Sequence, residues 1–590
     1  MAPAGSSESA DLVVIGAGWN GLCAAKTYHQ CHPDSKMIIL DDQPTIGGVW
    51  AEHRLYPGLK TNNMRGNYEF GDFTTEQAGL NVKQGAHILG HEVHQYLKKY
   101  AEEFDIVRYF RFNTKVIAAE HLPEGRGWLL SITTGDKTSQ IVTRRLVVAT
   151  GLTSDAFVPH VPGSHAKGAP PIIHVKDFQD RSAELFKTVK SATVLGGTKS
   201  AWDVSYAFAS TGIPVDWVIR ESGHGPVWMS PAFFNKERNI LLERLVHTRL
   251  ISLFSPCIWG SEDGYKWTRR FLHNTKLGRW VVRRYWSYMQ GRLVRTNTYD
   301  EHEEVGKLKP WVDMFWIAGS LSILNYPTDF FDLVRTGMIK VHIADIGSLR
   351  DHEILLSDGK AIPSDALICS TGWRHRPAIN FLPKGIDATL GIPHVGPNPD
   401  IKATAKADAE LLRELPALKT QPLLNPRYKP MAGHKPSESL DEPYRLYRFM
   451  VPPAFYIERS IAFAGIVQSI STVYIAQAQA LWMAAYFDGY NAPALTKFDG
   501  DEKKLVDHIT WQTMLHTQYG KWRCPGGYGS RFPDFVYDGL PYMDLLLKDL
   551  GLKNKRKASM FQELFSPYLT SDYAEIVDEW RTKATRSSKL

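Results

Sequence analysis

Short apolar runs separated by mixed stretches dominate the first forty residues of the chain. The run Leu-Val-Val-Ile at 12–15 predicts a buried parallel strand, and residues 22–28 have the composition of a helix. A second apolar run, Met-Ile-Ile-Leu at 37–40, predicts the neighbouring strand. Strand, helix and strand in this order predict a βαβ unit, whose helix crosses over one face of a parallel sheet.

The same order of elements recurs once. Residues 192–195 and 215–219 predict strands on either side of a second helix. Three further apolar runs predict buried strands that return to the first sheet: 146–151, 365–373 and 461–468. Residues 395–445 are rich in proline and predict an irregular surface loop. The pattern predicts an α/β fold with two Rossmann-like units.

Glycines follow the first strand in GxGxxG spacing. Gly16 allows a sharp turn, Gly18 allows the backbone to approach a pyrophosphate, and Gly21 allows close packing of helix on strand. The phosphates would lie at the helix N-terminus. Asp41 ends the second strand, where an acid suits ribose hydroxyls. These residues predict a site for an adenine dinucleotide.

The second unit differs at two positions. Its turn contains Gly196, Lys199 and Ser200, but Thr198 stands where the second glycine is expected, which puts the closest backbone approach in question. Its second strand ends in Arg220 rather than an acid, which suits a 2′-phosphate and favours NADPH over NADH, with Lys199 as a second cation. The alternative is that Arg220 is a solvated charge at a strand end.

Two motifs after Asp41 carry a specific resemblance. Gly47-Gly48-Val49-Trp50 and the segment Tyr-Pro-Gly-Leu-Lys-Thr-Asn at 56–62 resemble those of the class B flavoprotein monooxygenases, which include the flavin-containing and the Baeyer–Villiger monooxygenases. The resemblance covers about residues 10–225 and 330–490. It implies that the first unit holds FAD and the second holds NADPH.

The resemblance also implies residue roles. Asn62 would act near the reacting face of the flavin, and the helix from Thr472 would point its N-terminus at the flavin ring. Further FAD contacts are implied at Gly48, Trp50, Thr61, Asn62, Val116, Thr150, Gly465 and Gln468. Without the resemblance, Trp50 would be an ordinary core aromatic and Asn62 a turn residue.

His174 and Phe178 match the second half of a family fingerprint, FxGxxxHxxx(F/Y/W). The first half is missing, because Gly168 and Pro170 stand where phenylalanine and glycine are expected. His174 is therefore a candidate catalytic residue, and a structural role in a linker is the equal alternative.

In the family, reduced flavin reacts with O2 to a flavin C4a-(hydro)peroxide, which inserts one oxygen atom into an organic substrate. Asn62 stands where the Baeyer–Villiger pattern has an acid, and one extra residue lies between Trp50 and Tyr56. We therefore expect electrophilic oxygenation at nitrogen or sulfur, of a small apolar secondary metabolite as in fungal biosynthetic members. Baeyer–Villiger oxygenation of a ketone or aldehyde is the next alternative. An NAD(P)H oxidase or reductase, or a flavin-binding protein with a structural or sensing role, follows.

The resemblance suggests three segments. Residues 1–165 form the first part of the FAD-binding domain, and 166–360 form the NADPH-binding domain with a helical insertion at about 223–335. Residues 361–590 form the second part of the FAD-binding domain and a C-terminal helical cover. A chain of 590 residues is too long for a single core, which agrees with several domains.

Positive charge is concentrated in the insertion. The chain carries a net charge of +7, and residues 236–295 contain 13 Lys or Arg against 4 Asp or Glu, interleaved with aromatics. The segment is either a substrate-entry cap, which rests on an anionic membrane surface or receives an apolar substrate, or a helical insertion with a solvated basic face. No nucleic-acid-binding motif is present, so we expect no nucleic-acid partner.

The five cysteines are scattered without a CxxC pair, which argues against a disulfide scaffold, a zinc site and a dithiol redox centre, and we expect no metal site. The N-terminus has no apolar signal-peptide core, and no apolar run is long enough to span a bilayer. The chain ends in Ser588-Lys589-Leu590, a motif that the peroxisomal import receptor reads. We expect a peroxisomal enzyme. The alternative is an enzyme of the cytosol, either free or associated with a membrane.

Overall fold

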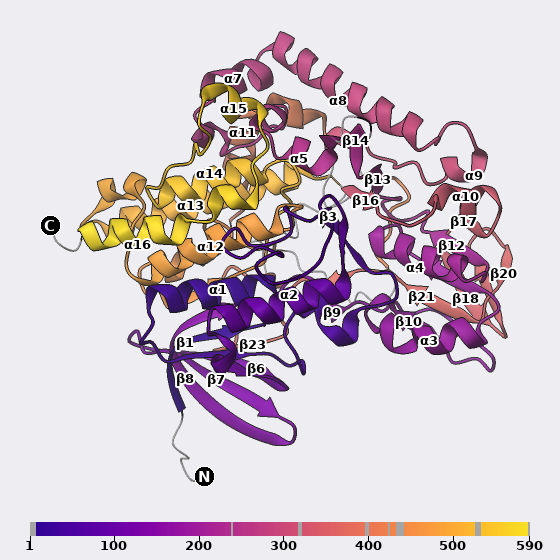
Figure 1. Ribbon diagram of the computed structural model, residues 1–590, viewed down its shortest axis with the longest axis horizontal. Coiled ribbons are helices and arrows are strands. Elements are labelled where there is room, and N and C mark those ends of the chain that lie inside the picture. Colours follow the sequence, from indigo (N-terminus) through magenta and orange to yellow (C-terminus); the bar gives the residue numbers. More distant parts are fainter. Residues whose placement is uncertain are drawn as a thin grey trace.

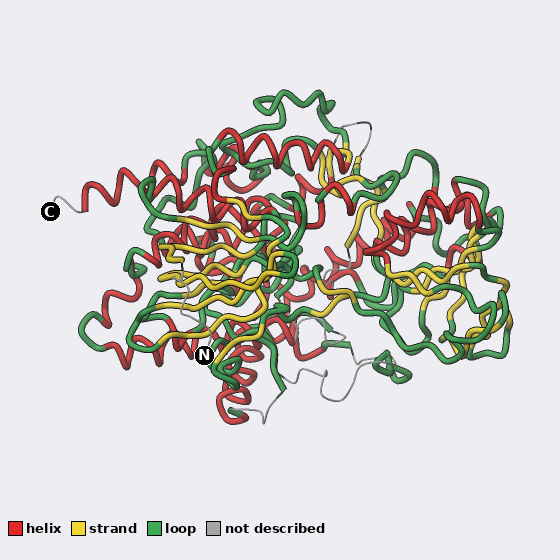
Figure 2. The backbone as a smooth tube through the Cα atoms, turned by 90° about the horizontal axis from the view of Figure 1, so that it is seen from below, coloured by secondary structure: helices red, strands yellow, loops and turns green. Residues whose placement is uncertain are grey.

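The computed structural model describes residues 8–587, except 236, 238–239, 317–320, 396–399, 423–424, 432–441 and 526–532. Its strands gather in two main groups with mostly loops between them (Figure 2). One sheet lies at the lower left of Figure 1 and the other at the right, and helices cover the upper side of the molecule. The predicted α/β fold with two Rossmann-like units is confirmed.

The first sheet has the order β23-β6-β7-β8-β1-β2-β5, with β24 also paired to β8. Its strands are β1 (Glu8–Ile15), β2 (Met37–Leu40), β5 (Phe110–Arg111), β6 (Thr114–Leu122), β7 (Gly127–Thr134), β8 (Lys137–Val148), β23 (Asn380–Leu382) and β24 (Ile461–Phe463). Alternate residues of β1 enter different cores, Leu12 and Val14 on one face and Val13 and Ile15 on the other. Both faces are buried, which explains the uninterrupted apolar run.

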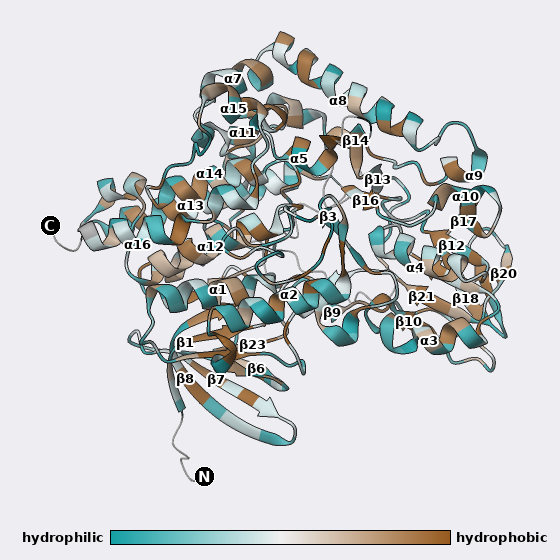
Figure 3. Ribbon diagram, in the orientation of Figure 1, coloured by the Kyte–Doolittle hydropathy of each residue, from teal (hydrophilic) through white to brown (hydrophobic). Residues whose placement is uncertain are grey.

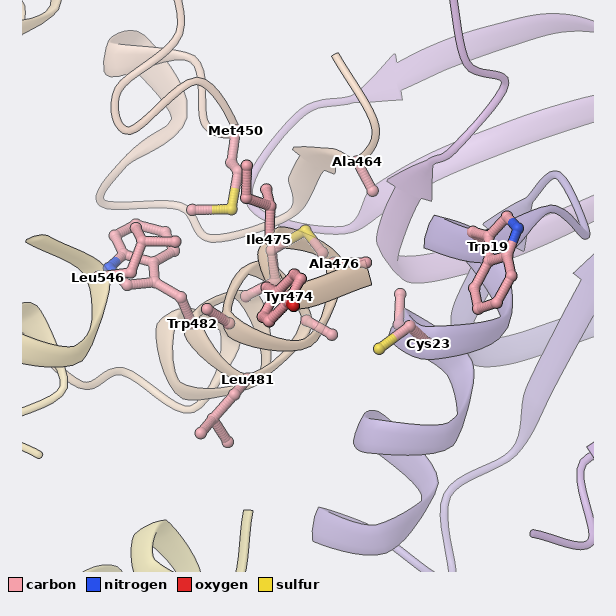
Figure 4. Close-up of a cluster of buried hydrophobic side chains, with 14 of the residues drawn as sticks. Trp19, Cys23, Met450, Ala464, Tyr474, Ile475, Ala476, Leu481, Trp482 and Leu546 are labelled. Atoms are coloured by element: carbon pink, nitrogen blue, oxygen red, sulfur yellow. The ribbon is translucent and has the colours of Figure 1, made fainter. Parts of the chain in front are cut away.

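Helix α12 (Thr472–Phe487) packs between α1 (Trp19–Cys31) and α14 (Gly539–Asp549), as the side chains of Trp19, Ile475 and Leu546 show in Figure 4. Every residue from Val473 to Phe487 is buried. A helix that is apolar on all sides requires partners on all sides. The C-terminal segment supplies one of them, so it belongs to the same core as the first βαβ unit.

The second sheet is wholly parallel, in the order β10-β21-β11-β12-β17. Its strands are β10 (Ile172–His174), β11 (Ala192–Leu195), β12 (Val215–Ile219), β17 (Ile339–Ile343) and β21 (Ala366–Cys369). Helices α3 (Phe178–Thr188) and α4 (Lys199–Ser210) share a core with one face. The antiparallel strands β18 (Ile346–Arg350), β19 (Glu353–Leu356) and β20 (Ala361–Pro363) share a core with the other face.

Two expectations are corrected here. The sequence assigns the strand at 365–373 to the FAD-binding part, which would begin at 361, whereas β21 pairs with β10 and β11 in the second sheet. The sequence also predicts a loop throughout 395–445, but α11 (Ile401–Glu414) lies within it. This helix buries Ala407 and Leu411 against α13, an amphipathic pattern that the surrounding prolines obscure.

The insertion and the C-terminal segment pack together over the first unit. Arg249 is fully buried and pairs with Asp544 and Glu563, so the two segments share an ion-pair network. The helices are α5 (Leu242–Val246), α6 (Arg249–Leu253), α7 (Lys266–Asn274), α8 (Lys276–Thr296), α9 (Glu303–Gly306), α10 (Phe330–Arg335), α13 (Glu502–Arg523), α15 (Met560–Phe565) and α16 (Ile576–Ser587). In Figure 3, α8 alternates between hydrophilic and hydrophobic residues along the upper rim.

Shorter elements connect these parts. They are β3 (Lys60–Met64), β4 (His87–Leu89), α2 (Gly90–Glu103), β9 (Asp155–Ala156), β13 (Trp228–Pro231), β14 (Phe233–Asn235), β15 (Ile240–Leu241), β16 (Leu321–Leu324) and β22 (Trp373–Arg374). In the described part of the chain, no helix is both long and apolar enough to cross a bilayer.

Candidate active site

Three parallel strands of the first sheet end side by side. The N–H of Ala149 donates to Ile15 O at 2.8 Å, and the N–H of Ala464 donates to Val148 O at 2.9 Å. The carboxyl ends of β1, β8 and β24 therefore meet at one edge of the sheet, where ligands bind in open parallel sheets. Thr150 and Gly465 follow at the same edge.

The three glycines of the GxGxxG turn are needed for different structural reasons. Gly16 has a φ of +110°, and a Cβ on Gly21 would lie 1.9 Å from Gly16 O, so both are required by the turn and its packing. A Cβ on Gly18 would make ordinary contacts, with Gly48 Cα at 3.6 Å as the nearest atom. Gly18 is thus not required by packing, and its bare backbone beside Gly48 leaves room for a pyrophosphate.

Helix α1 begins directly at this turn. Its N-cap is Gly18, without a side-chain hydrogen bond, and its first turn contains no acid. Its first N–H groups remain available for a phosphate. Asp41 accepts from the N–H of Ala17 at 2.6 Å and from that of Gln43 at 2.9 Å, and burial raises its pKa to about 6. A carboxylate held in this way retains lone pairs for ribose hydroxyls, so the residues present fit FAD.

Strand β3 presents Asn62 from a rigid frame. The Thr61 hydroxyl donates to Asn63 O at 2.5 Å and accepts from Ile88 N at 3.0 Å, and the Asn63 amide donates to Ile470 O at 3.0 Å. Thr61 and Asn63 are buried, whereas Asn62 between them is half-buried. Alternation along the strand therefore directs Asn62 to the opposite face.

The remaining predicted FAD residues fall around this frame. The Trp50 indole donates to the Tyr68 hydroxyl at 3.1 Å. Val116 lies at a register shift of β6, two residues after Thr114, whose N–H donates to Asp41 O at 2.9 Å. A Cβ on Gly465 would lie 2.7 Å from the side-chain nitrogen of Asn20. The segment after β24 therefore passes close to α1. Gln468 is exposed, and its backbone bonds to Pro533 and Phe535.

The second unit repeats the turn geometry. Gly196 has a φ of +136°, and its N–H donates to Val218 O at 3.0 Å. Helix α4 begins after Thr198 without a side-chain cap or an acid in its first turn, and Ser200 lies in that turn, so its N-terminal N–H groups fit a phosphate. Arg220 directly follows β12 and donates to Asp345 at 3.2 Å and to Ser222 Oγ at 2.6 Å.

Lys199 points toward the first unit. Its ammonium pairs with Asp203 and donates to Asn325 Oδ1 at 2.9 Å. Asn325 in turn donates to Thr61 O at 3.2 Å, and the Tyr56 hydroxyl donates to Asp203 at 2.9 Å. Lys199 and Arg220 share no partner among the described residues. Sequence reasoning missed Asp203 and Asn325; the only local signal was Tyr56, inside the motif at 56–62.

His174 is 1% exposed, and both of its ring nitrogens are engaged. Nε2 lies 3.1 Å from Gly372 O, and Nδ1 accepts from Lys176 N at 3.1 Å. Burial lowers its pKa. This placement favours the structural alternative for His174 over a catalytic one.

Known proteins resemble this chain over nearly its whole length. Residues 13–244 match the family described as pyridine nucleotide-disulphide oxidoreductase. The chain is 30% identical over 595 residues to the FAD-dependent monooxygenase rstn6 of Aspergillus nomiae, covering 97% of this chain and 98% of that protein. It is 31% identical over 593 residues to the FAD-dependent monooxygenase resA of Aspergillus sclerotiorum, with 97% and 98% covered.

The chain belongs to the class B flavoprotein monooxygenases. The closed crystal structure of cyclohexanone monooxygenase matches with a TM-score of 0.59 at 15% identity, over 92% of this chain and 97% of that one. At that identity the likeness shows the shared fold. The enzyme uses FAD and NADPH and inserts one atom of O2 into a small organic substrate. All five cysteines are free, unlike those of the dithiol enzymes that the family description names.

Bound FAD, reduced by NADPH, supplies the oxygen-activating chemistry. The chain's own residues bind and orient it: the turns at Gly18 and Thr198 offer N–H groups, and β3 presents the Asn62 amide. The roles of the individual site residues stay predictions.

Proposed function

We propose that this monooxygenase oxygenates a nitrogen or sulfur atom of a small apolar secondary metabolite. The observation that carries the proposal is a small apolar pocket inside the insertion, to which the C-terminal segment adds Tyr537. Its lining is Leu242, Leu245, Val246, Ile251, Tyr285, Trp286, Met289, Met314, Leu321 and Tyr537. Leu242 precedes Glu243, which bonds to Met64 of β3, and Leu321 begins β16, which contacts β3. An apolar lining of this kind favours an apolar substrate over a polar one.

Asn62 supports oxygenation at a heteroatom. Its amide stands at the β3 position where the Baeyer–Villiger pattern has an acid, and an amide cannot hold a charged arginine as a carboxylate does. Baeyer–Villiger oxygenation of a ketone is the alternative reaction, and its observation would contradict the proposal.

The experiment compares a lipophilic thioether, tertiary amine and ketone of one carbon skeleton. We expect NADPH-dependent formation of the sulfoxide or N-oxide, detected as a mass gain of one oxygen. Exclusive conversion of the ketone to an ester would overturn the heteroatom assignment. Met289→Gln, inside the pocket, should raise KM for these substrates about tenfold, since one buried polar group costs about 1–3 kcal/mol. Tyr288→Gln, exposed on the same helix, is the control.

We also propose that α7 and α8 contact an anionic membrane surface. Residues 266–296 contain nine Lys or Arg and no Asp or Glu. Large apolar side chains on these helices face solvent, among them Trp267 (78% exposed) and Trp280 (54%). Basic residues with exposed tryptophan favour binding at the headgroup level of anionic lipid.

Co-sedimentation tests the membrane contact. The enzyme should pellet with phosphatidylcholine vesicles that contain phosphatidylserine, less so at high salt, and not with phosphatidylcholine alone. Trp267→Ala with Trp280→Ala should remove this binding, whereas Phe561→Ala, exposed on α15, should not. Equal binding by the double variant would refute the contact.

We propose a peroxisomal location, with a cytosolic one as the alternative. Ser588-Lys589-Leu590 lies outside the described residues and follows α16 in the sequence; α16 itself lies at the left of Figure 1. A fluorescent protein fused to the N-terminus should mark peroxisomes, and removal of Leu590 should leave the fluorescence in the cytosol. Unchanged distribution would rule out this signal.

A further inference from the structure

Helix α5 brings a buried carboxylate against strand β3. Glu243 is 8% exposed, and its Oε1 accepts from the N–H of Met64 at 3.0 Å and from the side-chain amide of Asn67. Its other oxygen, Oε2, is buried and has no hydrogen-bond partner among the described residues. Met64 is two residues beyond Asn62 on the same strand. A buried carboxylate oxygen without a partner is costly, and sites of this kind are often functional.

Two further polar groups lie around Glu243. His247, the C-cap of α5, has Nε2 at 2.6 Å from Ser471 Oγ, and its ring lies 4.9 Å from that of Tyr474. His247 Nδ1 and the Tyr474 hydroxyl are also buried without partners in the described part of the chain. Ser471 is the N-cap of α12, directly after Ile470, which binds Asn63. The cluster therefore extends from β3 to the start of α12.

The charges around Glu243 decide which member of the cluster can titrate. The cation Arg244 acts on it from the neighbouring position, and Tyr474 faces it from α12. Burial outweighs the hydrogen bonds and Arg244, and raises the pKa of Glu243 to about 7. Burial lowers the pKa of His247 to about 4, so this ring is neutral near pH 7. Glu69 and Asp572 act on Tyr474 from farther away.

We propose that Glu243 holds the proton that each oxygenation cycle consumes. The overall reaction converts NADPH, H⁺, O2 and substrate into NADP⁺, oxygenated substrate and water. NADPH and the substrate each supply two electrons, one oxygen atom enters the substrate, and the consumed proton ends in the water. Glu243 gives up this proton, becomes a carboxylate, and regains a proton from solvent before the next cycle. The balance is the same for a heteroatom and for a ketone, so the inference is independent of the substrate.

The test uses Glu243→Gln, with Glu69→Gln as the matched control. Glu69 is another buried glutamate, five residues after the end of β3, and its carboxylate accepts a hydrogen bond from the N–H of Thr75. The reduced enzyme is mixed with O2 without substrate, and the lifetime of the absorbance band that forms is measured from pH 5.5 to 8.5. We expect the wild-type lifetime to change about tenfold or more across pH 7, and the Gln variant to be independent of pH. The control should follow the wild type.

A second measurement does not depend on cofactor chemistry. The folded protein binds the Glu243 proton more tightly than the unfolded chain, so its stabilisation is complete below about pH 4.5 and is lost as pH rises through 7. The Tm of apoprotein unfolding is measured for Glu243→Gln and for the wild type. The difference, variant minus wild type, should rise between pH 5 and 7 and then level off. A flat difference would overturn the proposal, as would a wild-type lifetime profile in this variant. Failure of every test substrate to react, with the lifetime profile intact, would affect the proposed substrate and leave Glu243 in place.

Discussion

Two glycines in the first turn should separate packing from cofactor binding. A methyl group on Gly21 would lie 1.9 Å from Gly16 O and 2.9 Å from Gly16 C, both backbone atoms that cannot rotate away. A methyl group on Gly18 would lie 3.6 Å from Gly48 Cα, an ordinary contact, and the φ of −85° at Gly18 is open to alanine. Gly21→Ala therefore disturbs the apoprotein, whereas Gly18→Ala disturbs only what binds beside it.

The two substitutions should change the free energy of unfolding by clearly different amounts. Gly21→Ala must push strand and helix apart by about 1.5 Å, because nonbonded carbon contacts relax only near 3.5 Å. Overpacking of this kind costs about 1–3 kcal/mol and more where backbone is involved, so we expect a loss of about 3 kcal/mol in unfolding free energy. Gly18→Ala should leave that free energy within about 1 kcal/mol, since it also restricts the unfolded chain by about 0.5 kcal/mol.

Thermal unfolding of the apoprotein with and without excess FAD separates the two effects. FAD at about a thousand times its Kd should stabilise the wild type by about 4 kcal/mol. Gly18→Ala should melt like the wild-type apoprotein and gain little from FAD, while Gly21→Ala should melt earlier without any ligand. A Gly18→Ala protein with undiminished FAD stabilisation would refute the assignment of Gly18, and an apoprotein of Gly21→Ala as stable as the wild type would refute the packing argument.

Three further substitutions have defined outcomes. Arg220→Met should raise KM for NADPH about tenfold and leave KM for NADH unchanged, because it would remove the predicted charge-assisted contact to the 2′-phosphate; equal effects on both would contradict this. Asp544→Asn leaves Arg249 buried with Glu563 as its remaining acidic partner, so urea unfolding should show a loss of about 3 kcal/mol. Glu243→Gln should cancel a pH-dependent stability difference of about 3 kcal/mol between pH 4.5 and 7, measured by denaturant titration at each pH.

Contiguous residues carry most of the information about the two nucleotide-binding units. The runs at 12–15 and 192–195, and the glycines that follow them, specify strand and turn because burial and backbone freedom are local properties. The predicted edge at Gly16, Gly18, Asp41 and Gly48 accordingly assembles in the structure as the spacing indicates.

The path of the chain decides the remainder. An apolar run at 365–373 marks a buried strand in either sheet, and only the pairing of β21 with β11 assigns it to the second. Lys199 has a phosphate-binding position in the turn, yet its ammonium bonds to Asp203 and Asn325. Glu243 lies 179 positions from Met64, and no local pattern relates them. Side-chain partners far apart in sequence depend on how whole elements pack, so the interface between the units and the carboxylate beside β3 became visible only in three dimensions.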